Sequence, residues 1–256
     1  RFPIIPGHEF VCQVAEVGEE AAIHHGVKVG DIVAVELVIP CWECHWCKQG
    51  LYNLCIQDGL EGREYGCNIP TTRPPGLWGG YAEYLYVPYN AIVHKYPDDV
   101  NLLAAAFTEP LSVAVRAVNL ARGRLLADAA VIVGAGTIGL MQGVAAKVAG
   151  FDPVILLGTR DRRLEMALEL GCADVVVNIR KEDPLKVVNS LTNDLGAGVV
   201  FETAGSISAQ QTCFDYCRKA GIVVLVGLTG ARMVPINTDL SIAFKELTVQ
   251  PSFLNA

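Results

Sequence analysis

Residues 130–139, Ala-Val-Ile-Val-Gly-Ala-Gly-Thr-Ile-Gly, decide the fold of this chain. A short β-branched run leads directly into a G-x-G-x-x-G fingerprint at a predicted strand–helix junction. There the first glycine permits a tight turn, the second lets the backbone approach a pyrophosphate, and the third allows close packing of helix on strand. We therefore predict a dinucleotide-binding turn, the alternative being a glycine-rich turn that only packs. The expected cofactor contacts in it are Gly134, Gly136, Thr137, Ile138 and Gly139.

The sequence after this turn continues the alternation of strand and helix. Short apolar runs at 154–157, 175–178, 199–202 and 222–226 predict buried strands, and the segments between them predict helices. Such alternation is typical of an α/β fold, in which a doubly wound parallel sheet is covered by helices on both faces. We expect residues 113–256 to form a Rossmann dinucleotide-binding domain.

Residues 1–112 have a different texture. Strand signals at 9–17, 31–38 and 81–87 are interrupted by glycine, proline and charged turns, which favours an irregular β-barrel. A helical segment at 102–120 is expected to connect this domain to the next.

Four cysteines, Cys41, Cys44, Cys47 and Cys55, follow one another in the order C-x2-C-x2-C-x7-C. Structural zinc binds four thiolates tetrahedrally, and a short loop with this spacing can surround one ion with little strain. The bacterial iron–sulfur run C-x2-C-x2-C-x3-C-P is not met, because seven residues precede the last cysteine and no proline follows it. The spacing favours structural zinc over an iron–sulfur cluster or unligated thiols.

Composition excludes several classes of protein. The 256 residues are 52% hydrophobic, enough for a substantial core, and the net charge of −7 argues against a nucleic-acid partner. Residues 129–146 are uncharged, but four glycines and a strand-like beginning argue against a membrane span. The sequence contains no signal-peptide pattern, and four of its nine cysteines are expected metal ligands, so we predict a cytoplasmic protein.

Several motifs stand in the order of a known family: Gly7-His8-Glu9, the four-cysteine segment, Glu109-Pro110-Leu111-Ser112 and the glycine fingerprint. Over essentially its whole length the chain resembles the zinc-dependent medium-chain alcohol dehydrogenases. Glu109-Pro110-Leu111 in place of a cysteine ligand makes it most similar to the polyol (sorbitol, xylitol) and threonine dehydrogenase branch. The resemblance implies a GroES-like barrel joined to a Rossmann domain, with the active site in the cleft between them.

The resemblance also implies a catalytic zinc held by His8 and Glu109, with Glu9 beside it to ligate the ion or relay a proton. A further cysteine ligand is expected upstream of Arg1, and a segment returning to the barrel is expected after Ala256. A zinc with an open position binds an alcohol oxygen as a Lewis acid while hydride leaves for a nicotinamide.

We therefore predict an enzyme that interconverts a secondary, polyol-like alcohol and its ketone, and that forms a homo-oligomer because the metal segment lies near a subunit contact in the family. The alternative is a non-catalytic or zinc-independent dinucleotide-binding protein of the same fold, which retains only the structural zinc.

The end of the second predicted strand departs from the common pattern for NAD. An acidic residue is usual there, to bind the ribose 2′-hydroxyl, but Gly158 occupies the position and three arginines follow it at 160, 162 and 163. Guanidinium groups suit a 2′-phosphate, which predicts NADP. In the alternative, the arginines are a solvated helix start and Asp161 caps the helix and serves the ribose of NAD. The expected cofactor contacts beyond the glycine turn are Gly158, Arg160, Arg163 and Gly227.

Overall fold

The computed structural model describes residues 3–56, 62–121 and 128–254. The chain divides into two compact units, Arg1–Glu109 with Leu254–Ala256, and Pro110–Phe253. The first unit carries both cysteine- and histidine-containing motifs, and the second carries the glycine fingerprint.

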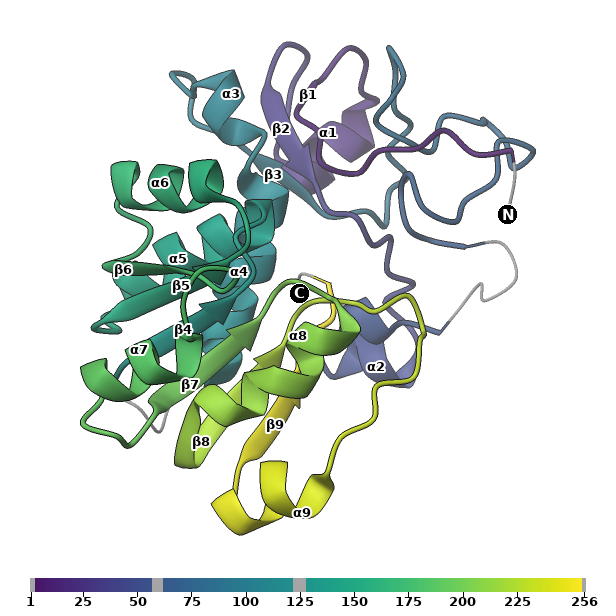
Figure 1. Cartoon of the computed structure of the whole chain (residues 1–256). Helices are drawn as coiled ribbons and strands as arrows, with labels where there is room; N and C mark the ends of the chain where they lie inside the picture. Colours follow the sequence, from purple (N-terminus) through teal and green to yellow (C-terminus); the bar gives the residue numbers. More distant parts are fainter. Residues whose placement is uncertain (1–2, 57–61, 122–127, 255–256) are drawn as a thin grey trace. The chain divides into compact units, whose positions relative to one another are not determined.

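The second unit is built on a six-stranded sheet in the order β6-β5-β4-β7-β8-β9, and every neighbouring pair is parallel (Figure 1). This is the strand order of a doubly wound dinucleotide-binding sheet. The chain adds β5 and β6 on one side of β4, and then returns to add β7, β8 and β9 on the other side. The predicted fold class is confirmed. The strands are β4 (Ala130–Val133), β5 (Val154–Gly158), β6 (Val175–Asn178), β7 (Ala197–Glu202), β8 (Cys217–Leu225) and β9 (Thr248–Pro251).

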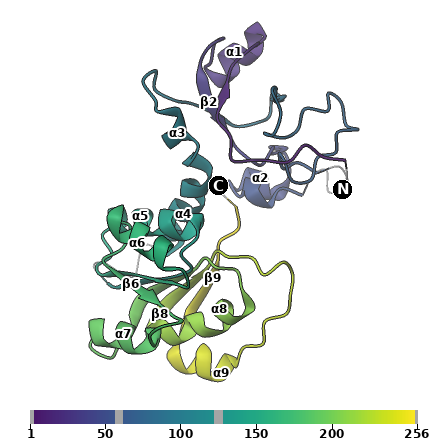
Figure 2. The same cartoon turned by 45° about the horizontal axis from the view of Figure 1, so that its top comes forward.

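Helices cover both faces of this sheet (Figures 1 and 2). Ile132 and Leu156 pack on one face with α4, α5 and α6, whereas Val131 and Ile155 pack on the other with α7 and the segment that follows α8. Adjacent strand residues point to opposite faces, so strands buried on both sides are apolar throughout. The helices are α4 (Thr108–Ala121), α5 (Thr137–Ala149), α6 (Asp161–Glu169), α7 (Pro184–Leu191), α8 (Ile207–Thr212) and α9 (Thr238–Ser241), with short 3-10 turns η2 (Cys213–Tyr216) and η3 (Ala243–Lys245).

Local sequence sets the ends of these helices. The Asp183 carboxylate accepts a hydrogen bond from the Leu185 backbone N–H at 3.0 Å, and Pro184 occupies the first turn of α7, where its missing N–H costs nothing. The buried Val188 anchors α7 to the sheet, a contact that contributes about 1.5–3 kcal/mol. Helix α5 ends at Gly150, whose φ of 90° is favourable only for glycine.

The first unit contains an antiparallel sheet of three short strands, β1 (Cys12–Gln13), β2 (Ile32–Val35) and β3 (Val93–Lys95). Leu37, Tyr65 and Trp78 are buried in its core. Short helical segments complete the unit, namely α1 (Glu19–His25), α2 (His45–Lys48), η1 (Tyr52–Leu54) and α3 (Leu102–Ala105). In the described parts of the chain, no helix is both long and apolar enough to cross a membrane.

The strands of this unit are shorter than the sequence predicts, and the strand expected at 81–87 is absent from the described structure. The backbone N–H of Tyr81 bonds to Pro6 O, whereas that of Tyr86 bonds to Leu77 O, so these two amides of the stretch find partners in different loops. The side-chain pattern cannot reveal this difference. Apolar and polar side chains can alternate in the same way whether the backbone bonds to one neighbouring strand or to separate loops.

Candidate metal and dinucleotide sites

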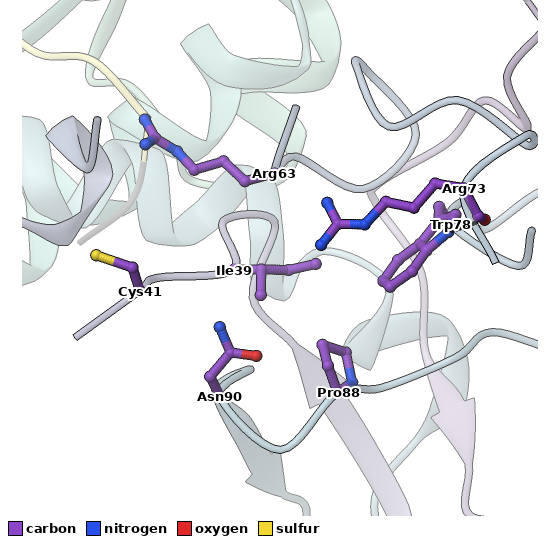
Figure 3. Close-up of a pocket in the computed structure, with 7 residues that line it drawn as sticks. All are labelled: Ile39, Cys41, Arg63, Arg73, Trp78, Pro88 and Asn90. Atoms are coloured by element: carbon purple, nitrogen blue, oxygen red, sulfur yellow. Dashed lines mark hydrogen bonds between the residues drawn. The ribbon is translucent and has the colours of Figure 1, made fainter. Parts of the chain in front are cut away.

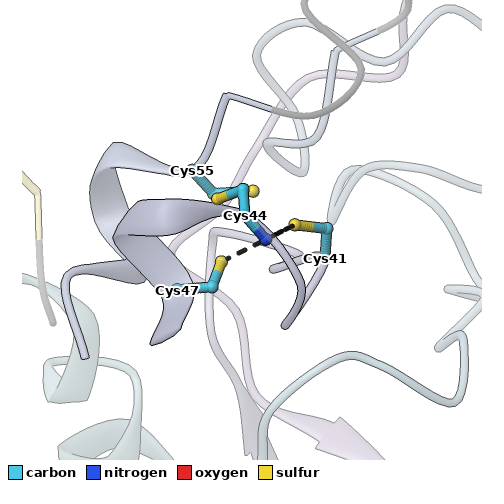
Figure 4. A group of neighbouring side chains, drawn as sticks. All are labelled: Cys41, Cys44, Cys47 and Cys55. Atoms are coloured by element: carbon cyan, nitrogen blue, oxygen red, sulfur yellow. Dashed lines mark hydrogen bonds between the residues drawn. The ribbon is translucent and has the colours of Figure 1, made fainter. Parts of the chain in front are cut away.

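The four cysteines of the predicted zinc segment converge in the first unit (Figure 4). Their sulfurs all lie within 4.8 Å of one another, and the sulfurs of Cys41 and Cys47 are 3.8 Å apart. Four sulfurs at about 2.3 Å from one tetrahedral ion are separated by about 3.8 Å, so the donor set and its spacing both fit zinc. Helix α2 carries Cys47 and the turn η1 ends at Cys55, and these two short elements fold the segment back on itself.

Backbone N–H groups are directed at the sulfurs. Those of Glu43 and Cys44 donate to the Cys41 sulfur at 3.4 and 3.3 Å. Hydrogen bonds from the backbone of Cys47 and Ile56 lower the pKa of Cys44 to about 6. These bonds stabilise the thiolate of Cys44, the form that binds metal, whereas burial raises the pKa of Cys47 to about 12. All nine cysteines of the chain are free thiols, so no disulfide competes for these four.

A second group of potential ligands consists of His8, Glu9 and Glu109, and one ligand atom of each lies within 4.8 Å of the others. Glu109 lies in the first turn of α4. The segment that carries His8 is held by backbone hydrogen bonds, since Gly80 N donates to Gly7 O at 2.8 Å. Gly7 has a φ of 97°, and a Cβ there would collide with the Tyr81 ring, which explains the glycine before His8.

The electrostatics of this group favour a cation. Burial and, to a smaller extent, the negative charge of Glu9 together raise the pKa of Glu109 to about 7. Two carboxylates and an imidazole within ligand distance are donors that zinc accepts in open catalytic sites. The residues therefore fit a divalent metal ion, which would remove the repulsion between the two carboxylates.

Cys67 is a neighbour of this group that the sequence does not reveal. Its sulfur lies 3.6 Å from His8 Nδ1, although the two residues are 59 positions apart. No metal-ligand spacing connects them, and Cys67 stands outside the four-cysteine pattern. Of the nine cysteines, Cys67 is the exposed one.

The glycine fingerprint forms the turn between β4 and α5. Gly134 has a φ of 117°, and a Cβ at Gly139 would collide with the Gly134 carbonyl, so the first and third positions require glycine. Around Gly136, in contrast, no atom of the described chain other than Gly136 and its sequence neighbours lies within 4 Å of the place a Cβ would take. This open space lies at the N-terminus of α5, where free N–H groups favour phosphate, so the turn fits a dinucleotide.

Charged side chains beyond β5 divide into paired and unpaired ones. The Asp161 carboxylate accepts hydrogen bonds from Asn178 Nδ2 at 2.7 Å and Lys181 Nζ at 2.8 Å. Asp161 is the first residue of α6 and does not cap it, since Arg160 holds the N-cap position. Arg162 pairs with Glu169 at 3.2 Å. Arg160 and Arg163 are both exposed and form no ion pair with any residue that the structure describes.

Two further glycines of the predicted cofactor site are tightly packed. A Cβ on Gly158 would lie 2.8 Å from the Ala135 side chain and 2.9 Å from Leu164, so no acidic side chain fits at the end of β5. Gly227 follows β8, and its backbone N–H donates to Glu202 O at 2.8 Å. A Cβ there would collide with the backbone of Gly205.

A cavity of about 60 Å³ also lies in the first unit (Figure 3). The Arg73 guanidinium stacks on the Trp78 ring at 5.1 Å from its centre, and Cys41 forms part of the wall. None of the three ligands of the second group lines this cavity, so it is separate from the site built on His8.

Residues 1–98 match the family described as alcohol dehydrogenase GroES-like domain, and residues 137–256 match the family described as zinc-binding dehydrogenase. A sorbitol dehydrogenase of Bombyx mori is 32% identical over 98% of this chain, which spans 68% of that protein. The chain belongs to the zinc-dependent medium-chain alcohol dehydrogenase family.

Other members of this family extend the comparison. An erythritol/L-threitol dehydrogenase of Mycolicibacterium smegmatis is 38% identical over 96% of the chain, which spans 64% of that relative, less than two thirds of its length. The crystal structure of a Sinorhizobium meliloti protein described as a zinc-binding dehydrogenase, bound to NADP, superposes with a TM-score of 0.85 at 29% identity. It covers all of this chain, and the chain covers 70% of it.

Proposed function

We propose that this chain is part of a zinc-dependent oxidoreductase that transfers a hydride between a secondary, polyol-like alcohol and a nicotinamide cofactor. The observation that carries the proposal is the meeting of His8, Glu9 and Glu109 within 4.8 Å in a zinc-dependent dehydrogenase chain. The names of the relatives, an erythritol/L-threitol and a sorbitol dehydrogenase, support a polyol as the substrate class.

In this proposal each residue has a separate task. His8 and Glu109 hold the catalytic zinc, which when bound supplies Lewis-acid chemistry to an alcohol oxygen. Glu9 is exposed beside them and accepts or relays the alcohol proton. The four cysteines hold a structural zinc, because a closed tetrathiolate site leaves no position for a substrate.

The test of the function is an assay of the full-length, zinc-loaded protein with erythritol, sorbitol and xylitol and either nicotinamide cofactor. We expect formation of reduced cofactor with at least one of these polyols, and loss of this activity after treatment with a chelator. Cofactor binding without oxidation of any secondary alcohol would instead support a non-catalytic dinucleotide-binding protein.

The cofactor we propose is NADP, with Arg160 and Arg163 contacting its 2′-phosphate. The position of Gly158 has no room for an acidic side chain, so the usual acceptor for the ribose of NAD is missing there. The nearby carboxylate of Asp161 already accepts hydrogen bonds from Asn178 and Lys181. The NADP bound to the S. meliloti structure agrees with this choice.

Arg160→Ala is expected to lower kcat/KM for NADP roughly tenfold or more, since a charged contact contributes about 1.5–3 kcal/mol, and to leave kcat/KM for NAD nearly unchanged. Arg162→Ala is the matched control, because the Arg162 guanidinium is already paired with Glu169. A wild-type preference for NAD that Arg160→Ala does not alter would refute the proposed phosphate contact.

Zinc binding to the second group is expected to weaken as the pH falls through about 7, the pKa to which burial and Glu9 raise Glu109. Above this pH the carboxylate is already ionised. Below it the metal must displace a proton, which costs up to about tenfold in apparent affinity per pH unit. Competition with a chromophoric chelator across this range measures the effect, and Glu19→Gln, an exposed carboxylate on α1, is the control. An affinity that is independent of pH would contradict the assignment of Glu109.

We further propose that residues 1–112 form the catalytic domain and residues 113–256 the cofactor domain. This division is supported by the two compact units of the chain, whose boundary in the sequence lies between Glu109 and Pro110. A thiolate-rich metal site favours a reducing compartment, so we place the protein in the cytoplasm. A homo-oligomer, expected from the family, can be tested by light scattering of the full-length protein.

A further inference from the structure

The side chain of His8 has one hydrogen-bonding neighbour in the described parts of the chain, the thiol of Cys67. The sulfur lies 3.6 Å from Nδ1, within reach of a hydrogen bond to sulfur. We propose that Cys67 is a positioning residue, which accepts the N–H of His8 Nδ1 and thereby presents Nε2 to the catalytic metal. The inference rests on the proposed zinc site and adds a residue that no ligand pattern includes.

The chemistry of imidazole explains why this contact matters. A neutral histidine carries one ring proton, and only the nitrogen without it can bind a metal. Histidine ligands almost always donate their other ring N–H to an acceptor, which fixes both the tautomer and the orientation of the ring. An acceptor at Nδ1 therefore favours the tautomer with a free lone pair on Nε2.

The backbone holds Cys67 in this place. Gly66 N donates to Trp78 O at 2.8 Å, and Cys67 N donates to Glu64 O at 3.2 Å. Gly66 has a φ of 68° and lies directly against Gly7, where a Cβ on Gly66 would collide with the Gly7 backbone. The residues that precede Cys67 and His8 are thus in contact, so the sulfur and the ring are brought together by rigid segments with short side chains.

The geometry favours positioning over direct ligation. The ligand atoms that share a sphere of 4.8 Å come from His8, Glu9 and Glu109, and the sulfur of Cys67 is not among them. It contacts the ring of one ligand and stands outside the group as a whole. This is the arrangement of an outer-shell acceptor, and loss of such an acceptor typically weakens metal binding about 10- to 100-fold.

The test measures zinc affinity in the full-length protein, by competition with a chromophoric chelator, and does not depend on activity. We expect two zinc ions in the wild-type protein and a weaker second site in Cys67→Ala, by roughly tenfold, because sulfur is a weak acceptor. Cys67→Ser should restore the affinity to within about threefold, since a hydroxyl also accepts the Nδ1 proton. Cys12→Ala removes another thiol of the same unit, with no bond to His8, and should change nothing.

A second readout follows the tautomer of His8 directly. In metal-free protein labelled with 15N-histidine, the His8 ring should carry its proton on Nδ1 in the wild type and in Cys67→Ser, and lose this preference in Cys67→Ala. Equal zinc affinities and unchanged tautomers in wild type and Cys67→Ala would overturn the positioning role alone. If Cys67→Ser binds zinc as weakly as Cys67→Ala, the sulfur is itself a ligand and the positioning role is also wrong. A wild-type protein that binds only one zinc ion would overturn the proposed function as well.

Discussion

Replacing His8 with alanine in the full-length, zinc-loaded protein is expected to abolish alcohol oxidation without unfolding the chain. His8 supplies the nitrogen ligand of the second metal group, and an alanine at this position offers the metal no donor atom, so the site loses one of its expected ligands. Loss of the metal removes several kcal/mol of transition-state stabilisation. We expect kcat/KM to fall at least about 1,000-fold, equivalent to about 4 kcal/mol.

The accompanying zinc analysis should show one equivalent in His8→Ala and two in the wild-type protein, with unchanged circular dichroism. His45→Ala is the matched control, since His45 is an exposed histidine of the four-cysteine segment whose ring contacts Gln49. It should retain both metals and full activity. Substantial activity in His8→Ala would show that this histidine does not hold the catalytic zinc.

Cys44→Ser is expected to release the other zinc ion and to unfold the segment from Cys41 to Cys55. Structural zinc binds small domains with about 10–16 kcal/mol of apparent free energy. The helical elements of this segment are short, since α2 has four residues and η1 has three, and side-chain hydrogen bonds such as that from Tyr52 to Glu36 supply much less. The variant should retain one zinc equivalent, become sensitive to proteolysis within this segment and melt at a lower temperature. The cofactor-binding unit, whose core is separate, should still bind dinucleotide.

Cys12→Ala serves as the control for Cys44→Ser as well, because Cys12 is a thiol of the same unit that belongs to neither metal group. It should keep both zinc ions and the wild-type pattern of proteolysis. Two zinc equivalents in Cys44→Ser, or a disulfide between two of the four cysteines in reducing buffer, would refute the closed zinc site.

The sequence predicts the second unit well because its strands are buried on both faces. The runs at 154–157 and 175–178 correspond to β5 (Val154–Gly158) and β6 (Val175–Asn178). All of β5 is buried and its residues are apolar or glycine, because helices cover it on each side, whereas β6 at the sheet edge is partly exposed and ends in Asn178. In the first unit the strand that the sequence predicts at 81–87 is absent from the described structure. There the backbone bonds to two different loops, at Pro6 and Leu77, and the pattern of side chains does not indicate which loop lies nearby.

The candidate metal site was predictable only in part. Spacing alone brings the four cysteines together, because all four lie in one short segment. His8 and Glu109 are far apart in sequence, and only the family resemblance connects them, since no spacing of residues does. The contact of Cys67 with His8 and the engagement of Asp161 by Lys181 depend on tertiary structure, so neither could be inferred from the sequence.

Both metal groups lie in Arg1–Glu109, whereas the glycine turn lies in Pro110–Phe253. The metal ions and the nucleotide therefore bind to different units of the chain, and neither binding step has to precede the other during biosynthesis. A chain that matures without zinc is therefore expected to fold its nucleotide-binding module while its four-cysteine segment stays open to proteases.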